Sequence, residues 1–137
     1  MYTNHPNHIE REDGVCFARN EVNVEYREYL AWVAAGNTPD EAPSPSLEQR
    51  ALMLLAGVDE HLNAAARAKG YDSIITASLR AALPASPFHA EGVAFGTWMD
   101  AVYAKCYEVL AQVKADEIAE PTTDELLAML PALQLPT

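Results

Sequence analysis

Basic residues are scarce in this chain, and their scarcity excludes one large class of functions. The chain has 9 lysines and arginines against 20 aspartates and glutamates, which gives a formal net charge of −11. Binding to duplex nucleic acid requires cations that displace counterions from the phosphates, and binding to an anionic membrane surface requires them as well. We therefore expect neither a nucleic-acid nor a membrane partner.

Cysteines and long apolar runs are also scarce. The two cysteines, Cys16 and Cys106, lie far apart in the sequence. This spacing fits neither a disulfide framework nor a zinc motif, and it indicates a reducing compartment. No apolar run reaches the 18 residues of a membrane-spanning helix. The first residues also lack the basic start and apolar stretch of a signal peptide. The sequence thus predicts a small soluble protein.

Apolar residues are plentiful, at 50% of the 137 residues, which suffices for one folded domain with an appended arm. The charge is unevenly spread. Residues 1–45 hold 8 acids and 3 bases (−5), residues 46–115 hold 7 acids and 6 bases (−1), and residues 116–137 hold 5 acids and no base (−5). A nearly neutral folded unit is therefore expected between acidic ends, which favour solubility or attract basic partners.

The N-terminal part, residues 1–36, predicts an arm made of a short hairpin and a helix. Asp13-Gly14 is a favoured two-residue turn, because both positions tolerate positive φ, so residues 9–17 are expected to form a hairpin. A helix is expected over residues 23–35, where the first residue is an asparagine that can cap it. Three prolines then predict an extended linker over residues 37–45.

The remaining residues predict a helical domain over 46–131, followed by a loose tail over 132–137. Capping boxes at Ser46 and Thr122 mark two helix starts. The apolar spacing predicts helices over 46–69, 73–83, 87–115 and 123–130. The predicted fold is mainly α: an antiparallel helical hairpin or small bundle, with a short N-terminal β-hairpin or extended arm.

Residue patterns that carry catalysis or bind a cofactor are not found in the sequence. It has no phosphate-binding glycine loop and no serine on a strand-turn-helix elbow. His5, His8, Glu10 and Asp13 are a local group of metal-ligand types, with Cys16 nearby. The group lies on what reads as a flexible, proline-bearing terminus, so we expect no metal site. A small hydrolase or metal enzyme is accordingly disfavoured, and we predict a non-enzymatic protein without a cofactor.

Aromatic residues are the most informative group. Tyr26, Tyr29 and Trp32 crowd one short helix that cannot cover them by itself. Two interpretations follow: the helix folds back onto the 46–115 helices, or it docks on another protein, since Tyr and Trp dominate binding hot spots. We take these three residues as the candidate partner-binding site.

Two parts of the chain resemble known proteins. The first is the Asp13-Gly14 turn followed by Asn-x-x-Tyr-x-x-Tyr-Leu-x-Trp at residues 23–32 and Gly-Asn-Thr-Pro at residues 36–39. The second comprises Gly70–Ile74, Ala90–Gly92, Trp98–Cys106, Pro121-Thr122, Glu125–Leu127 and Leu130-Pro131. Together they are similar to small tail proteins of tailed bacteriophages, of the tail-fibre assembly or minor tail protein kind.

That resemblance implies a role in forming or assembling the phage tail fibre or tail tip through protein–protein contacts. It implies a tail-fibre or tail-tip protein as partner, a homo-oligomer as an option, and the host cytoplasm or the virion tail as the location. It brings no catalytic residues. The alternative hypothesis, taken from the net charge alone, is an acidic adaptor or regulatory protein that binds a basic protein.

Overall fold

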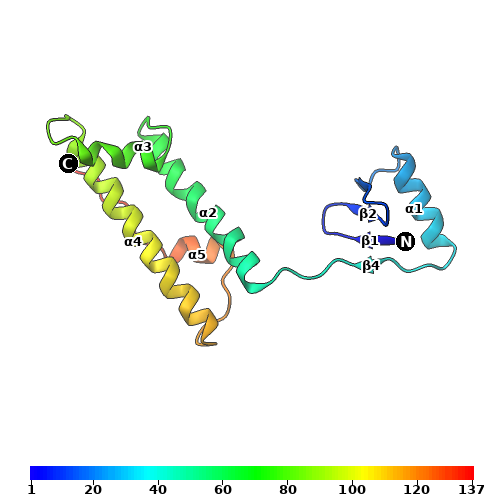
Figure 1. The fold of residues 1–137 in the computed structure, drawn as a ribbon. Helices are drawn as coiled ribbons and strands as arrows, with labels where there is room; N and C mark the ends of the chain where they lie inside the picture. Colours follow the sequence, from blue (N-terminus) through cyan, green and yellow to red (C-terminus); the bar gives the residue numbers. More distant parts are fainter. The chain divides into compact units, whose positions relative to one another are not determined.

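The computed structural model describes residues 1–137, which divide into two units, Met1–Pro45 and Ser46–Thr137 (Figure 1). The division falls between the last proline of the predicted linker and the serine that caps the next helix. The linker itself differs from the expectation. Residues 40–41 form a strand that joins the N-terminal sheet, so the stretch 37–45 belongs to the first unit.

The first unit contains a four-stranded sheet in the order β3-β2-β1-β4. The hairpin predicted around Asp13-Gly14 is confirmed, because β2 and β3 pair antiparallel. Its turn is longer than the two residues predicted: the backbone N–H of Arg11 donates to the carbonyl of Val15, and Gly14 has a positive φ (+85°) whereas Asp13 does not. The other two strands were not predicted. β1 pairs antiparallel with β2, and β4 lies parallel to β1 on its other side. The strands are β1 (Tyr2–Asn4), β2 (Ile9–Arg11), β3 (Cys16–Phe17) and β4 (Asp40–Glu41).

A single helix, α1 (Val24–Ala34), packs against this sheet. Asn23 caps it as predicted, because its Oδ1 accepts the backbone N–H of Glu25 at 2.8 Å. The core beneath the helix consists of the buried Tyr2, Ile9 and Phe17, which alternate onto one face of the sheet. A small core of its own therefore stabilises the first unit.

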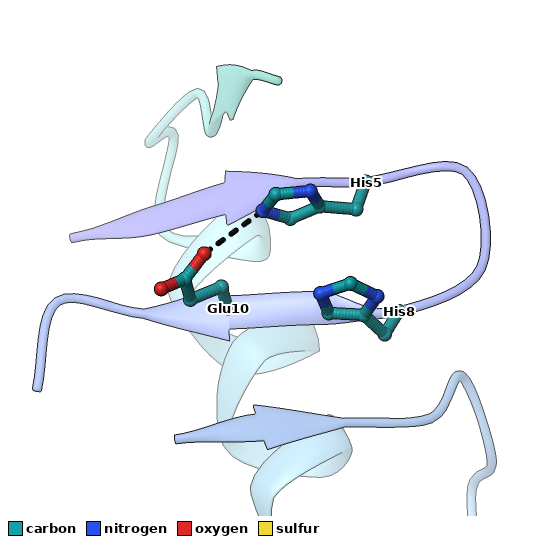
Figure 2. A group of neighbouring side chains, drawn as sticks. All are labelled: His5, His8 and Glu10. Carbon is teal, nitrogen blue, oxygen red and sulfur yellow. Dashed lines mark hydrogen bonds and ion pairs between the residues drawn. The ribbon is translucent and has the colours of Figure 1, made fainter. Parts of the chain in front are cut away.

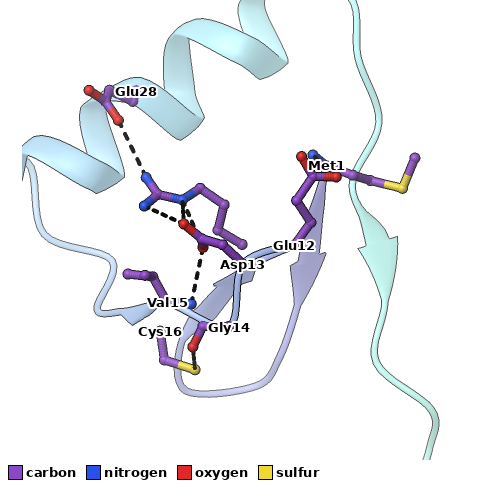
Figure 3. Close-up of polar contacts among 8 residues, drawn as sticks. Met1, Glu12, Asp13, Gly14, Val15, Cys16 and Glu28 are labelled. Atoms are coloured by element: carbon purple, nitrogen blue, oxygen red, sulfur yellow. Dashed lines mark hydrogen bonds and ion pairs between the residues drawn. The ribbon is translucent and has the colours of Figure 1, made fainter.

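Charged side chains link the hairpin turn to α1 (Figure 3). Arg11 donates from Nε and Nη2 to the two carboxylate oxygens of Asp13, at 3.0 and 2.9 Å. Asp13 Oδ1 also accepts the backbone N–H of Val15 at 3.2 Å, and the Arg11 Nη1 atom lies 3.8 Å from a carboxylate oxygen of Glu28 on α1. The hydrogen bonds from Arg11 lower the pKa of Asp13, so this ion pair with Arg11 persists at neutral pH.

The second unit is helical: α2 (Leu47–Ala68), α3 (Ile74–Ser78), the 3₁₀ helix η1 (Leu79–Ala82), α4 (His89–Lys114) and α5 (Thr123–Met129). The long helices α2 and α4 run antiparallel, α3 lies across one end of the pair, and α5 lies beside them (Figure 1). Both predicted capping boxes are present, at Ser46 and at Thr122. The mainly α fold with short N-terminal strands is thus confirmed.

Two predicted helix boundaries differ in the structure. The helix expected over 73–83 is split into α3 and η1, because the last turn tightens before Pro84. The helix expected from residue 87 begins at His89, and its N-cap residue is Phe88. The Ser86 hydroxyl accepts the backbone N–H of Phe88, at 3.1 Å, just before the helix.

The core of the second unit lies where α2, α3, α4 and α5 meet. Its fully buried large side chains include Val58, Leu62, Phe95 and Val102, and Trp98 is 6% exposed. The tail also differs from the loose segment expected, because Leu133 and Leu135 pack against this core. Trp98 Nε1 donates to the backbone carbonyl of Pro131 at 2.7 Å.

Gly92 explains how α3, η1 and α4 come so close together. A Cβ built on Gly92 would lie 2.5 Å from the backbone nitrogen of Ala81 and 2.6 Å from the Cβ of Arg80. The missing side chain of Gly92 therefore permits this close approach. At Gly96, one turn further along α4, the nearest atom would be the Cβ of Ser78 at 3.8 Å, which is an ordinary contact.

None of the helices combines the length and apolar character needed to cross a bilayer.

Candidate functional site

An apolar groove of about 640 Å³ lies within the second unit, between the first half of α2 and the second half of α4. The two halves face each other because the helices are antiparallel, and α5 with the segment before it closes one side. The side chains lining the groove are mostly aliphatic and aromatic: Leu47, Ala51, Leu52, Leu54, Leu55, Val58, Tyr103, Cys106, Tyr107, Val109, Leu110, Val113, Pro121 and Leu126. A concave, apolar wall of this size is typical of a binding site.

The deep end of the groove carries one polar pair. The Tyr103 hydroxyl on α4 donates to Asp59 Oδ1 on α2 at 2.7 Å. Burial, with the hydrogen bond to Asp59, raises the pKa of Tyr103 to about 12. Burial likewise raises the pKa of the nearby Cys106 thiol. Both groups are therefore protonated at neutral pH, so Cys106 contributes to the wall as a small apolar side chain.

The rim of the groove holds large side chains in contact with solvent. Leu52 on α2 is 66% exposed and Tyr107 on α4 is 73% exposed. The charged residues lining the groove are Glu48, Asp59, Lys114 and Glu120, three acids against one base. Arg50 Nε donates to the Glu120 carboxylate at 2.8 Å, which connects α2 to the segment before α5. The rim thus combines exposed apolar contact surface with charged side chains of both signs, since Glu48 and Glu120 are accompanied by Lys114 and Arg50.

Sequence reasoning did not single out Leu52 and Tyr107. The signal for Tyr107 is the width of the apolar surface of α4, because Tyr103, Tyr107 and Leu110 follow one another at helical spacing beside the core stripe. Such a surface is wider than one packed neighbour covers. Leu52 could not be recognised in this way, because the neighbouring leucines and methionine of α2 make that stretch apolar on every side.

The predicted partner-binding residues Tyr26, Tyr29 and Trp32 lie elsewhere, in the first unit. The three side chains are partly buried against the core of that unit. The Tyr2 ring meets the rings of Tyr29 and Trp32 edge-on, with centroids 5.3 and 5.1 Å apart. The cover comes from the unit's own sheet, which neither interpretation of the sequence included. Contact of these residues with a partner stays a prediction.

The group of possible metal ligands is brought together on the same sheet, on the face opposite Ile9 (Figure 2). His5 and His8 stack with ring centroids 4.3 Å apart and an angle of 10° between the rings. His5 Nε2 lies 2.9 Å from Glu10 Oε2. The structure leaves Asp13 out of this group, because its carboxylate is bound by Arg11. The Cys16 thiol lies near the carbonyl of Gly14, at 3.8 Å.

The other two histidines serve packing. The His61 ring meets the Trp98 ring edge-on at 5.7 Å, and His89 Nδ1 lies 3.4 Å from the carbonyl of Arg80.

Comparisons of the chain with protein-family models, with curated proteins and with solved structures found no match.

Proposed function

We propose that this chain is a non-enzymatic bacteriophage tail protein that binds an apolar segment of a tail-fibre or tail-tip protein in the groove between α2 and α4. The observation that carries the binding role is the groove itself, whose apolar wall continues to the exposed Leu52 and Tyr107. The assignment to phage tails is supported by the resemblance of residues 23–39 and 70–131 to small tail proteins. The protein would act in the host cytoplasm during assembly, or within the tail.

The shape and charge of the groove favour an amphipathic helix with a basic residue near one end. The stretch of α2 that lines the groove runs from Leu47 to Asp59, and 1.5 Å per residue gives it a length of about 18 Å. A partner helix of about three turns matches that length and presents apolar residues at i, i+3, i+4 and i+7. Glu48 at the rim favours a lysine or arginine near one end of the partner helix, whereas the Glu120 carboxylate is already bound by Arg50.

The test measures binding of the purified chain to tail-fibre and tail-tip proteins from the genome that encodes it, with Leu52→Asp and Tyr107→Asp as variants. Truncating a hot-spot residue costs about 2 kcal/mol, so we expect each variant to weaken the dissociation constant at least about thirty-fold. Ile75→Asp is the matched control, because Ile75 is similarly exposed at 58% and does not line the groove. Circular dichroism checks that each variant is folded.

Each outcome of this test is decisive. Weakening confined to the two groove variants supports the proposal. Weakening by Ile75→Asp alone would move the interface to α3 and overturn the role of the groove. Absence of association with any fibre or tail-tip protein would overturn the tail assignment. Loss of self-association in the groove variants, measured by analytical ultracentrifugation, would make a second copy of the chain the occupant.

A second candidate function, an acidic adaptor for a basic protein, is favoured by the segment that leads from α4 into α5. This segment holds five acids and no base, and its Glu120 lies at the groove. The variant in which these acids become amides separates the two functions; it changes Asp116, Glu117, Glu120, Asp124 and Glu125. If the amide variant still binds the partner, the adaptor role is wrong. If the amide variant no longer binds while Leu52→Asp binds as the parent does, the adaptor role is supported.

A further inference from the structure

The hairpin formed by β1 and β2 places three metal-ligating side chains on one face of the sheet, independently of the groove and its proposed function. The register pairs Asn4 with Ile9, so His5 and His8 face each other across the two-residue loop Pro6-Asn7. The backbone N–H of His5 donates to the carbonyl of His8 at 3.0 Å and closes this loop. Glu10 follows His8 by two residues and therefore lies on the same face.

The backbone beneath these side chains is held in place. Ile9, between His8 and Glu10, is fully buried in the core on the other face. Arg19 fixes the loop from outside: its guanidinium donates to the carbonyls of His5 and Pro6, at 2.5 and 3.0 Å, and to the Asn4 side chain. The expectation of a flexible terminus, which counted against a metal site, is therefore wrong.

The distances between the donor atoms fit one shared ion. One ligand atom from each of His5, His8 and Glu10 lies within 4.8 Å of the other two. At a Zn–N distance of 2.0–2.1 Å, two donors on a tetrahedral ion are about 3.3 Å apart. The pair formed by His5 Nε2 and Glu10 Oε2, at 2.9 Å, is already near that separation. The third donor, His8, is partly exposed, so a rotation of its side chain would have room to bring it to the same ion.

The donor types and the charge also favour a cation. Imidazole nitrogens select zinc, copper, iron or nickel, and two histidines with one glutamate form a set that leaves a fourth position for water. The side chains of His5 and Glu10 are 25% and 42% exposed, so an ion reaches them from solvent. Residues 1–45 carry 8 acids and 3 bases, and this excess attracts cations to the unit.

We propose that His5, His8 and Glu10 form a binding site for a divalent transition-metal ion such as Zn²⁺. The ion would join the ends of β1 and β2 at the loop end of the hairpin and stabilise the first unit, because a ligand that binds only the folded state adds to its stability.

The experiment titrates the untagged full chain with ZnCl₂ by isothermal calorimetry and with CoCl₂ by visible absorbance. We expect one ion per chain, a cobalt spectrum with nitrogen and oxygen ligands, and a higher melting temperature for the first unit. Replacing a second-shell group costs 10- to 100-fold in metal affinity, so replacing a ligand should cost at least about tenfold. The test variants are His8→Gln and Glu10→Gln.

The matched control is His89→Gln, which removes one imidazole outside the hairpin and should bind as the parent does. A Cys16→Ser variant tests the thiol on the neighbouring strand. Equal affinity of His8→Gln and the parent, or no stoichiometric binding of either ion at millimolar concentration, would overturn the site. Binding that is lost in Cys16→Ser but kept in His8→Gln would assign the ion to the thiol and overturn it as well.

Discussion

Replacing Gly92 by alanine tests the close contact that holds η1 against α4. In an exposed helix interior this substitution is favourable, since alanine has a higher helix propensity than glycine by about 1 kcal/mol. At Gly92 the new Cβ would lie 2.5 Å from the backbone nitrogen of Ala81, well inside the closest distances that Cβ atoms adopt. The obstacle is backbone, so η1 must move away from α4.

The size of the effect follows from the difference between these two contributions. Overpacking a closely packed contact costs about 1–3 kcal/mol, which exceeds or offsets the gain in propensity. We expect Gly92→Ala to lower the free energy of unfolding by up to about 2 kcal/mol. Gly96→Ala is the internal control on the same helix. Its Cβ would meet only the Cβ of Ser78 at 3.8 Å, so the propensity gain remains and the unit becomes more stable by up to about 1 kcal/mol.

The assay is urea unfolding followed by tryptophan emission. The chain has two tryptophans, Trp32 in the first unit and Trp98 in the second, so a Trp32→Phe background reports the second unit alone. In a unit of about ninety residues, 1 kcal/mol shifts the melting temperature by about 4–8 °C, which thermal scans detect easily. If Gly92→Ala stabilises the unit as much as Gly96→Ala does, the close approach of η1 and α4 is absent in solution.

Three further predictions concern tryptophan and tyrosine side chains. Trp32→Ala should destabilise the first unit and leave the thermal unfolding of the second, monitored by Trp98, unchanged. If Trp32→Ala lowered the melting temperature of the second unit as much as Trp98→Ala does, residue 32 would be part of the helical core. Because the pKa of Tyr103 is raised to about 12, the protonated phenol stabilises the fold below pH 10, and this contribution is lost as the pH rises from 10 to 12. In an alkaline titration followed by tyrosinate absorbance at 295 nm, Tyr103 should ionise after the exposed tyrosines, and Tyr103→Phe should remove this late step. Deleting residues 131–137 should shift the Trp98 emission to longer wavelength and lower the melting temperature, because the indole loses its carbonyl acceptor; an unchanged spectrum would contradict the packing of the tail.

Features whose signal lies within a few consecutive residues could be predicted from the sequence. The capping boxes at Ser46 and Thr122 need only four residues each, and the Asp13-Gly14 pair marks the place of the hairpin, although not the length of its loop. The strands β1 and β4 have three and two residues, too few for any periodicity, and they pair across 37 positions, as Thr3 does with Asp40. Such pairing depends on the tertiary fold and leaves no local pattern.

The candidate sites show the same limit. The aromatic residues of α1 were recognised as needing cover, but the cover is Tyr2, which lies more than twenty positions upstream in an unpredicted strand. His5, His8 and Glu10 were recognised as ligand types, but their rigidity depends on the hairpin and on Arg19. The groove was not predicted, since it exists only where α2 and α4 are held beside α5.

The division after Pro45 has a consequence for how such a chain can evolve. Every strand pair and the aromatic core of the first unit lie before this point, and every core residue of the second lies after it. A genetic crossover between codons 45 and 46 would therefore exchange one intact folding unit for another and leave both hydrophobic cores whole. A gene with this layout can acquire a new helical half, with a different groove, in a single recombination event.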